Sequence, residues 1–295
     1  MPNSSENNAD SPENEADDSQ RSLHVTRVTR KSKEVRADIV AAEEPLEIRI
    51  VYGPVEKRRS KSLSITMRTP GNDAELANGF LLSENIVSHP SQISECEFVG
   101  PAPGNGDHGN TLMVELGVDV EIAIEKLQRH FYTTSSCGIC GKASLDAVRN
   151  QGTQSIKDTL LVKREVVFEM PNRLRVLQDV FDKTGGLHAA GLANSDGQVI
   201  EIREDVGRHN AVDKLIGSQM LTGSSFPLSG KILVVSGRAS FELVQKALMA
   251  SIPMMVAVGA PSSLAVELAK EFGLTLIGFA SETRFNIYSG EQRVV

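Results

Sequence analysis

The sequence has 295 residues, of which 40% are hydrophobic, and its formal net charge at pH 7 is −7. This length and apolar content suffice for one large core or two smaller ones. Nonspecific nucleic-acid binding needs a basic surface, which the composition does not provide. No run of about 18 apolar residues occurs, so no membrane-spanning helix is expected. We therefore predict partners that include neither nucleic acid nor a membrane.

The first 35 residues are rich in Asn, Ser, Asp and Glu, and then in Arg and Lys. A segment with so few apolar residues cannot bury enough surface to fold, and we predict a disordered tail over residues 1–35. A docking arm is the alternative. Residues 1–20 lack the apolar stretch of a secretory signal, so we expect a cytoplasmic protein.

Residues 36–132 are predicted to form a smaller, β-rich N-terminal domain. Apolar and polar residues alternate over residues 46–50 and 63–67, which is the pattern of a half-buried strand. Residues 111–116 continue in the same way. A helix that begins near Asp73 is expected between these strands.

Residues 151–295 are predicted to form an α/β domain. Apolar residues at helical spacing cover residues 171–183, and a hairpin with its turn at Asp196 and Gly197 follows. From residue 230 onward, short apolar strands alternate with amphipathic helices. This alternation is typical of a parallel sheet with right-handed crossovers. The expected fold class is therefore α+β overall, with an α/β C-terminal half.

Between these domains, residues 133–150 are predicted to form a loop that carries Cys137 and Cys140 in a C-x-x-C motif. The sequence has only three cysteines, which argues against a disulfide framework. A thiolate can attack a donor persulfide and take its outer sulfur, and a second thiol can release that sulfur or protect the first thiol. Lys142 nearby would lower a thiol pKa. We predict Cys137 as the persulfide carrier and Cys140 as its assistant.

Two other interpretations of the cysteine pair remain open. Half of a zinc site would need two more ligands, which His188 and His209 could supply. A thioredoxin-like redox pair would normally stand at a strand-to-helix junction of a βαβ unit, and the upstream segment is not such a unit. The third cysteine, Cys96, lies in a predicted strand and is expected to be a core thiol.

Charged and hydrogen-bonding residues gather where one predicted strand ends and a helix begins. Asp205, Arg208 and His209 occupy this junction, and His188 opens a strand of small residues. Active sites often lie at such junctions, but a solvated surface junction has the same composition. Both interpretations remain open at this stage.

The predicted parallel strands also offer a place for phosphates. Ligands bind beyond the carboxyl ends of such strands, where Arg238 follows one strand and Ser262 follows another. Free amides at helix N-termini favour anions, and an arginine can bind an anion in a bidentate manner. Ser240 and Ser262 could equally be ordinary helix caps. Neither the dinucleotide fingerprint nor the P-loop motif is present.

Four segments of the sequence stand in an order that resembles a known family. They are SSCGICG at 135–141, GGLHAAG at 185–191, REDVGRHNAVDKLIG at 203–217 and SGRASFELVQK at 236–246. Together they resemble the formate dehydrogenase accessory sulfurtransferase family, often called FdhD. The resemblance runs from about residue 43 to residue 288.

The resemblance implies a sulfurtransferase that forms a cysteine persulfide. The protein would accept sulfur from a cysteine desulfurase and deliver it to the molybdenum cofactor of formate dehydrogenase, a bis-molybdopterin guanine dinucleotide. Cys137 matches the family's persulfide position, and Cys140 is its partner. The resemblance also implies a homodimer with a cytidine-deaminase-like fold.

The family's cofactor contact near the C-terminus falls on six consecutive residues: Phe279, Ala280, Ser281, Glu282, Thr283 and Arg284. From the junction and strand-end arguments above, we add five residues as cofactor-binding candidates: His188, Asp205, Arg208, His209 and Arg238. No resident metal is expected.

The related deaminase fold raises the possibility of a zinc hydrolase. Such enzymes need H-x-E followed later by P-C-x-x-C. Here Ala190 stands where the glutamate is required, and the cysteines precede His188. We therefore reject deamination and keep, as the alternative function, a zinc-binding or nucleotide-binding accessory module without sulfur transfer.

Overall fold

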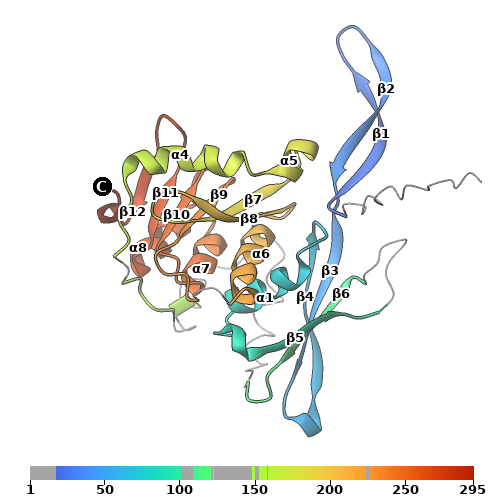
Figure 1. Ribbon diagram of the computed structural model, residues 1–295, viewed down its shortest axis with the longest axis vertical. Coiled ribbons are helices and arrows are strands. Elements are labelled where there is room, and N and C mark those ends of the chain that lie inside the picture. Colours follow the sequence, from blue (N-terminus) through green and yellow to red (C-terminus); the bar gives the residue numbers. More distant parts are fainter. Residues whose placement is uncertain are drawn as a thin grey trace, which may run out of the picture.

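The computed structural model describes residues 18–100, 109–120, 122, 148–149, 153–157, 159–223 and 226–295. The predicted sulfur-handling residues, Cys137 and Cys140, lie outside these ranges. The described chain contains sheets of two, four and six strands, with helices packed on the larger two (Figure 1). Within these ranges no helix combines the length and apolar character needed to cross a membrane.

The two-stranded sheet is an antiparallel hairpin of β1 (Gln20–Val28) and β2 (Lys33–Ala41). At its tip, the Thr29 side-chain oxygen accepts hydrogen bonds from the backbone N–H groups of Lys31 and Ser32. The hairpin overlaps the predicted disordered tail and corrects that prediction from Gln20 onward. The physical reason is that the charged residues alternate with Val, Thr and Ile, which favour extended backbone and which average composition conceals.

The four-stranded sheet has the order β4-β3-β6-β5. Its strands are β3 (Glu44–Tyr52), β4 (Arg59–Arg68), β5 (Ile93–Phe98) and β6 (Thr111–Leu116). The inward residues Leu46, Ile48 and Ile50 are at most 1% exposed. The alternation in the sequence therefore predicted strands β3, β4 and β6 correctly.

The six-stranded sheet has the order β12-β11-β10-β9-β7-β8. Its strands are β7 (His188–Ala193), β8 (Val199–Asp205), β9 (Ile232–Val235), β10 (Met254–Ala257), β11 (Thr275–Gly278) and β12 (Asn286–Ser289). Strands β9, β10 and β11 are parallel, as predicted, whereas β7, β8 and β12 join antiparallel. The start of β7 and the end of β8 consequently share one edge with the ends of β9, β10 and β11. We call it the carboxyl edge.

Helices cover both faces of this sheet (Figure 1). The helices are α1 (Asp73–Ser83), α4 (Arg164–Arg175), α5 (Asp179–Thr184), α6 (Arg208–Leu221), α7 (Phe241–Met249) and α8 (Ser263–Phe272), with 3-10 turns at Val55–Lys57, Pro90–Gln92 and Glu291–Arg293. Successive side chains of β9 point to opposite faces of the sheet. Ile232 and Val234 pack with α4, whereas Leu233 and Val235 join the core formed with α6, α7 and α8.

The helix predicted over residues 171–183 is in fact two helices. α4 begins at Arg164 with Pro171 inside it, and the chain leaves helical structure before α5. A proline is disfavoured inside a helix and common in its first turn, so the sequence pattern indicated too late a start. Gly185 ends α5 in the left-handed conformation, with φ of 68°, as predicted.

The two halves of the chain meet where α1 crosses α6. A methyl group on Gly79 would lie 1.9 Å from the carbonyl oxygen of Asp213, and one on Gly217 would lie 1.8 Å from that of Glu75. The helix backbones therefore touch, and only glycine fits at either position. Apolar residues of both large sheets form one cluster around this crossing. The mixed α+β class is confirmed, and the relation to cytidine deaminases stays a prediction.

Candidate functional site

Several predicted site residues meet at the carboxyl edge. His188 opens β7 and stands opposite Asp205, the last residue of β8. Arg208 begins α6 three residues later, and Arg238 follows the end of β9. The antiparallel entry of β7 brings His188 to the edge where ligands of parallel sheets bind. The sheet topology thus assembles residues that lie up to 50 positions apart in the sequence.

The electrostatic environment of His188 is basic. Burial lowers the pKa of this half-buried imidazole below its usual 6.5, and the positive charges of Arg208, His209 and Arg238 lower it further. Asp205 opposes them. Such an effect requires the cationic groups to be close to the imidazole. A neutral imidazole with three basic side chains nearby is suited to hold a polyanionic ligand.

The loop that carries Arg238 is fixed by close backbone contacts. The Ser236 side-chain oxygen accepts a 2.9 Å hydrogen bond from the Ala189 N–H, and the Gly259 N–H donates a 2.9 Å bond to the Gly237 carbonyl. A methyl group on Gly259 would come within 3.0 Å of the Arg238 backbone. The exposed Arg238 side chain is therefore presented to solvent by a rigid turn.

His209 is oriented by the first turn of α7. Its Nε2 atom lies 3.2 Å from the Ser240 hydroxyl oxygen and 3.8 Å from the Glu242 carboxylate. The nearby His209 imidazole is the largest cause that lowers the pKa of Glu242, to about 2. Glu242 is thus ionised at neutral pH and attracts the imidazole to this position.

A cleft of about 540 Å³ opens beside the basic residues. His188, Ser236 and Val258 contribute to it from the carboxyl edge. Helices α4 and α5 and the turn after them form its wall, with Pro171, Asn172, Leu174, Arg175, Gln178, Phe181, Gly185, Gly186 and Leu187. An apolar and aromatic lining with a few polar groups, at this volume, is typical of small-molecule sites.

The wall of the cleft is held by Glu204 of β8. Its carboxylate accepts hydrogen bonds of 3.0 and 2.9 Å from the backbone N–H groups of Val180 and Phe181, at the start of α5. Burial raises the pKa of Glu204. The Arg175 guanidinium lies 4.8 Å from the centre of the Phe181 ring. Sequence reasoning missed this wall, because its only signal was the helical spacing of apolar residues.

The predicted C-terminal cofactor segment is the turn after β11: Phe279, Ala280, Ser281, Glu282, Thr283 and Arg284. Phe279 has a left-handed φ of 52° and is 41% exposed, whereas Ala280 is buried. The Ser281 N–H closes the turn by donating to the carbonyl oxygen three residues on, 2.9 Å away. Glu282 accepts a hydrogen bond from Asn172 of α4. The segment therefore lies at the same carboxyl edge and contacts a helix that lines the cleft.

Asp205 lies behind the site rather than in it. Its side chain is 0% exposed and forms a 2.8 Å ion pair with Lys214, itself 1% exposed. The same carboxylate accepts hydrogen bonds from the Thr69 and Gly207 N–H groups and from the Asn210 side chain. This placement differs from the expectation that Asp205 contacts the cofactor, because no part of the carboxylate is open to a ligand. We assign it a positioning role for the turn that carries the basic residues.

The third cysteine, Cys96, packs beside the core as the sequence suggested. Burial raises its pKa to about 11, although the Asn78 side chain donates a 3.4 Å hydrogen bond to the sulfur. A thiol with so high a pKa is almost entirely protonated at neutral pH and is a poor nucleophile.

Comparison with known families assigns most of this chain to one family model. The model of the FdhD/NarQ family matches residues 41–295. The chain belongs to the FdhD/NarQ family. The resemblance noted in the sequence is therefore confirmed for this FdhD/NarQ protein, and the match includes both halves of the fold and the carboxyl edge.

Relatives of this FdhD/NarQ member agree with that assignment. A sulfur carrier protein FdhD from Streptomyces avermitilis is 49% identical over 273 residues, which cover 92% of this chain and 94% of the relative. The Streptomyces coelicolor protein of the same name is 50% identical over the same shares. A crystal structure of a formate dehydrogenase accessory protein from Desulfotalea psychrophila is 22% identical, with a TM-score of 0.70, over 94% of this chain and 99% of that one. The last comparison shows that the fold is shared.

Proposed function

We propose that this chain is a sulfur carrier, and that it transfers persulfide sulfur from a cysteine desulfurase to the molybdenum cofactor required by formate dehydrogenase. The observation that carries the proposal is the 49–50% identity, over 92% of the chain, to proteins named sulfur carrier protein FdhD. The accessory protein that shares the fold supports the link to formate dehydrogenase. We place the protein in the cytoplasm as a homodimer, and we relate its six-stranded sheet to that of the cytidine deaminases.

The carboxyl edge supports binding of a phosphate-bearing cofactor as the sulfur acceptor. Bis-molybdopterin guanine dinucleotide has pyrophosphates and flat heterocycles. The cluster of Arg208, His209 and Arg238 around His188 offers positive charge to the phosphates, and the adjacent cleft offers apolar and aromatic surface to a ring. In this proposal Phe279 and the turn that follows it contact the same ligand from the other end of the edge.

Loading begins with the Cys137 thiolate. It attacks the outer sulfur of the donor persulfide, so that a new S–S bond forms at Cys137 and the donor S–S bond breaks. The electron pair of the broken bond leaves on the donor cysteine, which departs as a thiolate. Cys137 now carries the sulfur as a persulfide.

Delivery uses the second thiol. The Cys140 thiolate attacks the inner sulfur of the Cys137 persulfide, which forms the Cys137–Cys140 disulfide and releases the outer sulfur as hydrosulfide at the bound cofactor. A thiol reductant then restores both thiols. The basic residues of the edge hold the cofactor during this step, and His188, which is neutral at pH 7, can accept a proton or donate one hydrogen bond to it.

Intact-protein mass spectrometry tests the loading step. After incubation with a cysteine desulfurase and cysteine, the wild-type chain should gain sulfur-sized mass increments that a reductant removes. Cys137→Ala should show none. Cys96→Ala is the matched control and should load like the wild type, because the Cys96 thiol is protonated and packed in the core. Loading that persists without Cys137 would refute its role.

Binding of guanosine diphosphate, the nucleotide half of the cofactor, tests the carboxyl edge. Removing one charge-assisted contact costs about 1.5–3 kcal/mol, which corresponds to roughly a 10- to 150-fold loss of affinity. Arg238→Ala should show such a loss in calorimetry, whereas Arg164→Ala on the exposed start of α4 should not. Equal affinities would place the nucleotide elsewhere.

The cleft and basic cluster also fit a nucleotide-binding accessory module without sulfur transfer. The Cys137→Ala variant separates the two functions when it is expressed in place of the wild-type chain. A binder would still support formate dehydrogenase activity with this variant, whereas a sulfur carrier would not.

A further inference from the structure

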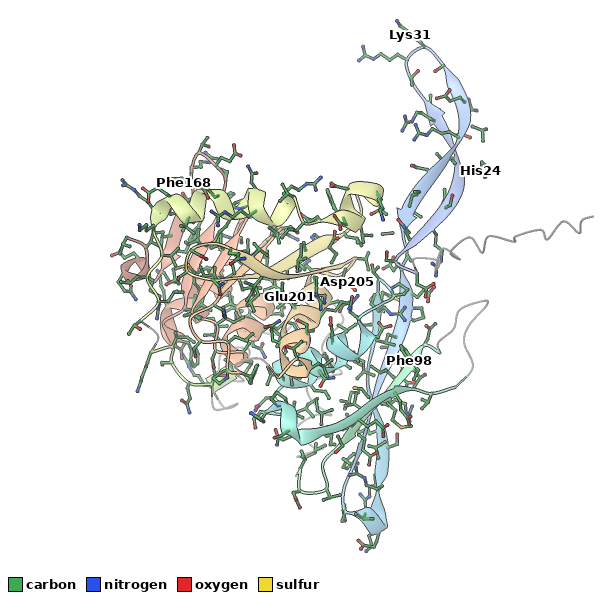
Figure 2. All side chains as sticks on the ribbon, viewed as in Figure 1. His24, Lys31, Phe98, Phe168, Glu201 and Asp205 are labelled. Carbon is green, nitrogen blue, oxygen red and sulfur yellow. The ribbon has the colours of Figure 1, made fainter. Side chains whose placement is uncertain are left out.

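The β1–β2 hairpin with its base, residues 18–41, extends away from the rest of the described chain (Figure 1). We call it the arm. Figure 2 shows Lys31 at its tip and His24 midway along it. Near the base, β2 contacts α5, and the Arg21 guanidinium forms a 2.8 Å ion pair with Glu44. The arm is therefore anchored at one end and exposed along most of its length.

One face of the arm carries exposed apolar side chains among polar ones. The antiparallel register places Val28, Val35, Ala37 and Ile39 on the same face, and all four are exposed, with Val28 and Val35 each 70% exposed. An isolated two-stranded hairpin is only marginally stable in water. Exposed apolar residues that gather on one face mark an interaction surface. The arm thus has the composition of an element that packs against another surface.

The arm is also basic. It holds six Lys and Arg residues and three Asp and Glu residues, a net charge of +3, whereas the whole chain is −7. The rest of the sequence is therefore −10. Four of the basic residues stand at or beside the tip: Arg27, Arg30, Lys31 and Lys33. A partner surface for the arm should be acidic with apolar residues among the charges.

The outward face of the four-stranded sheet has this composition. This face lies opposite the buried side of β3. It carries Ile65 and Met67 of β4, which are apolar and 70% and 48% exposed. Four carboxylates share this face: Glu47, Glu95, Glu97 and Glu115. Glu95 and Glu115 stand directly opposite each other, which is unfavourable for like charges unless a cation lies nearby. Arg58 pairs with Glu115 and Arg49 pairs with Glu47, whereas Glu95 and Glu97 are exposed.

The arm does not reach this face within its own chain. Only Ala42 and Glu43 separate the end of β2 from the start of β3, and the Ala42 N–H donates a 2.8 Å hydrogen bond to the Ser19 carbonyl at the base of the arm. Figure 1 shows the arm pointing away from the four-stranded sheet that follows it. A second copy of the chain can supply the complementary surface.

We propose that the arm of one copy lies on the outward face of the four-stranded sheet of a second copy, and reciprocally, in a two-fold dimer. The two contacts are identical, as two-fold symmetry requires. A ribbon about 30 Å long and about 10 Å wide covers on the order of 300 Å² on each of four contacting surfaces. The total of about 1,200 Å² reaches the lower limit of stable interfaces. The inference rests on the homodimer of the proposed function and gives it a surface. All of the arm except Ala41 lies ahead of the residues that match the family model.

Charge reversal in the full chain tests the proposal. The arm variant carries Arg30→Glu, Lys31→Glu and Lys33→Glu, and the sheet variant carries Glu95→Lys and Glu97→Lys. Each alone places like charges at both contacts. The mixture is complementary at both contacts, because the acidic arm meets the basic sheet and the unchanged arm meets the unchanged sheet. The control is Arg164→Glu, an exposed reversal on α4.

Sedimentation velocity gives the mass in each case. The wild type and the control should sediment at about twice the 31.9 kDa chain mass, each variant alone at the chain mass, and the mixture again at twice the chain mass. A monomeric wild type, variants that stay dimeric, or a mixture that stays monomeric would each overturn the proposal. Circular dichroism verifies that every variant is folded. Because sulfur loading is not measured, a failed sulfur-transfer assay leaves this test unaffected.

Discussion

Replacing Asp205 with Asn should destabilise the fold strongly, although the Asp205 side chain is itself buried behind the site. Asp205 and Lys214 form an ion pair of 2.8 Å in which both side chains are at most 1% exposed. Figure 2 shows Asp205 in the interior, between the C-terminal sheet and the strands of the N-terminal half. The substitution keeps the shape of the side chain but leaves the Lys214 ammonium buried with the Thr69 carbonyl as its remaining oxygen partner, 2.7 Å away.

The magnitude follows from the burial of the pair. Removing one charge from a buried ion pair costs about 3–5 kcal/mol, because the other charge stays out of water without compensation. One Asn oxygen can still accept the bonds from Gly207 and Asn210, but its NH₂ group then faces the Thr69 N–H and the Lys214 ammonium, which are both donors. For a chain of this size the loss corresponds to a fall of roughly 6–20 °C in melting temperature.

Urea unfolding followed by circular dichroism measures the change. Arg238→Ala, at an exposed position, should alter stability by less than about 0.5 kcal/mol while weakening guanosine diphosphate binding. Asp205→Asn combined with Lys214→Met should recover part of the lost stability, since the uncompensated charge is gone. A change of less than about 1 kcal/mol for Asp205→Asn would refute the reasoning. The network around Asp205 would then not hold the turn.

Three further predictions test other parts of the structure. Because folding lowers the pKa of His188, the unfolded chain binds a proton more readily at this residue, and the fold should lose stability as the pH falls below 6.5. His188→Gln should remove that pH dependence. In Arg208→Gln, an NMR titration should show a higher pKa for His188, because one positive charge is gone. Gly217→Ala should lower the free energy of unfolding in urea by about 1–3 kcal/mol or more, because the added methyl group meets a backbone oxygen of α1. The control is Gly117→Ala, whose methyl group would have ordinary contact distances, and it should lower that free energy by less than about 0.5 kcal/mol. Glu204→Ala should free two amides of α5, at about 1–3 kcal/mol, and hydrogen exchange that stays slow at both amides would contradict this.

The parts of the fold with strong periodic patterns were predictable. The strand predicted over residues 254–258 is β10, because four fully buried apolar residues in a row are the pattern of a strand covered on both faces. The rule that ligands bind beyond the carboxyl ends of parallel strands also placed Arg238 and the turn at Phe279 at the correct edge. His188 joins them only because β7 is antiparallel, which the sequence pattern does not determine.

The parts that depend on long-range contacts could not be predicted. Asp205 has the same local sequence whether its carboxylate faces solvent or Lys214, and only the approach of Thr69 from the other half decides its burial. The cleft wall depends on Glu204 anchoring α5, a contact between residues more than 20 positions apart. The hairpin from Gln20 onward was missed because average composition hides the alternation of β-branched residues.

The contact between Gly79 and Gly217 has a consequence for the region between the two halves of the chain. Because the two helix backbones touch and both large sheets share one core, cohesion of the molecule does not depend on the covalent connection through residues 123–147. A cut there would yield two fragments that still recognise each other, as in split proteins that reassemble. The packing of α1 on α6 and the shared core would then hold the two fragments together without a peptide bond between them.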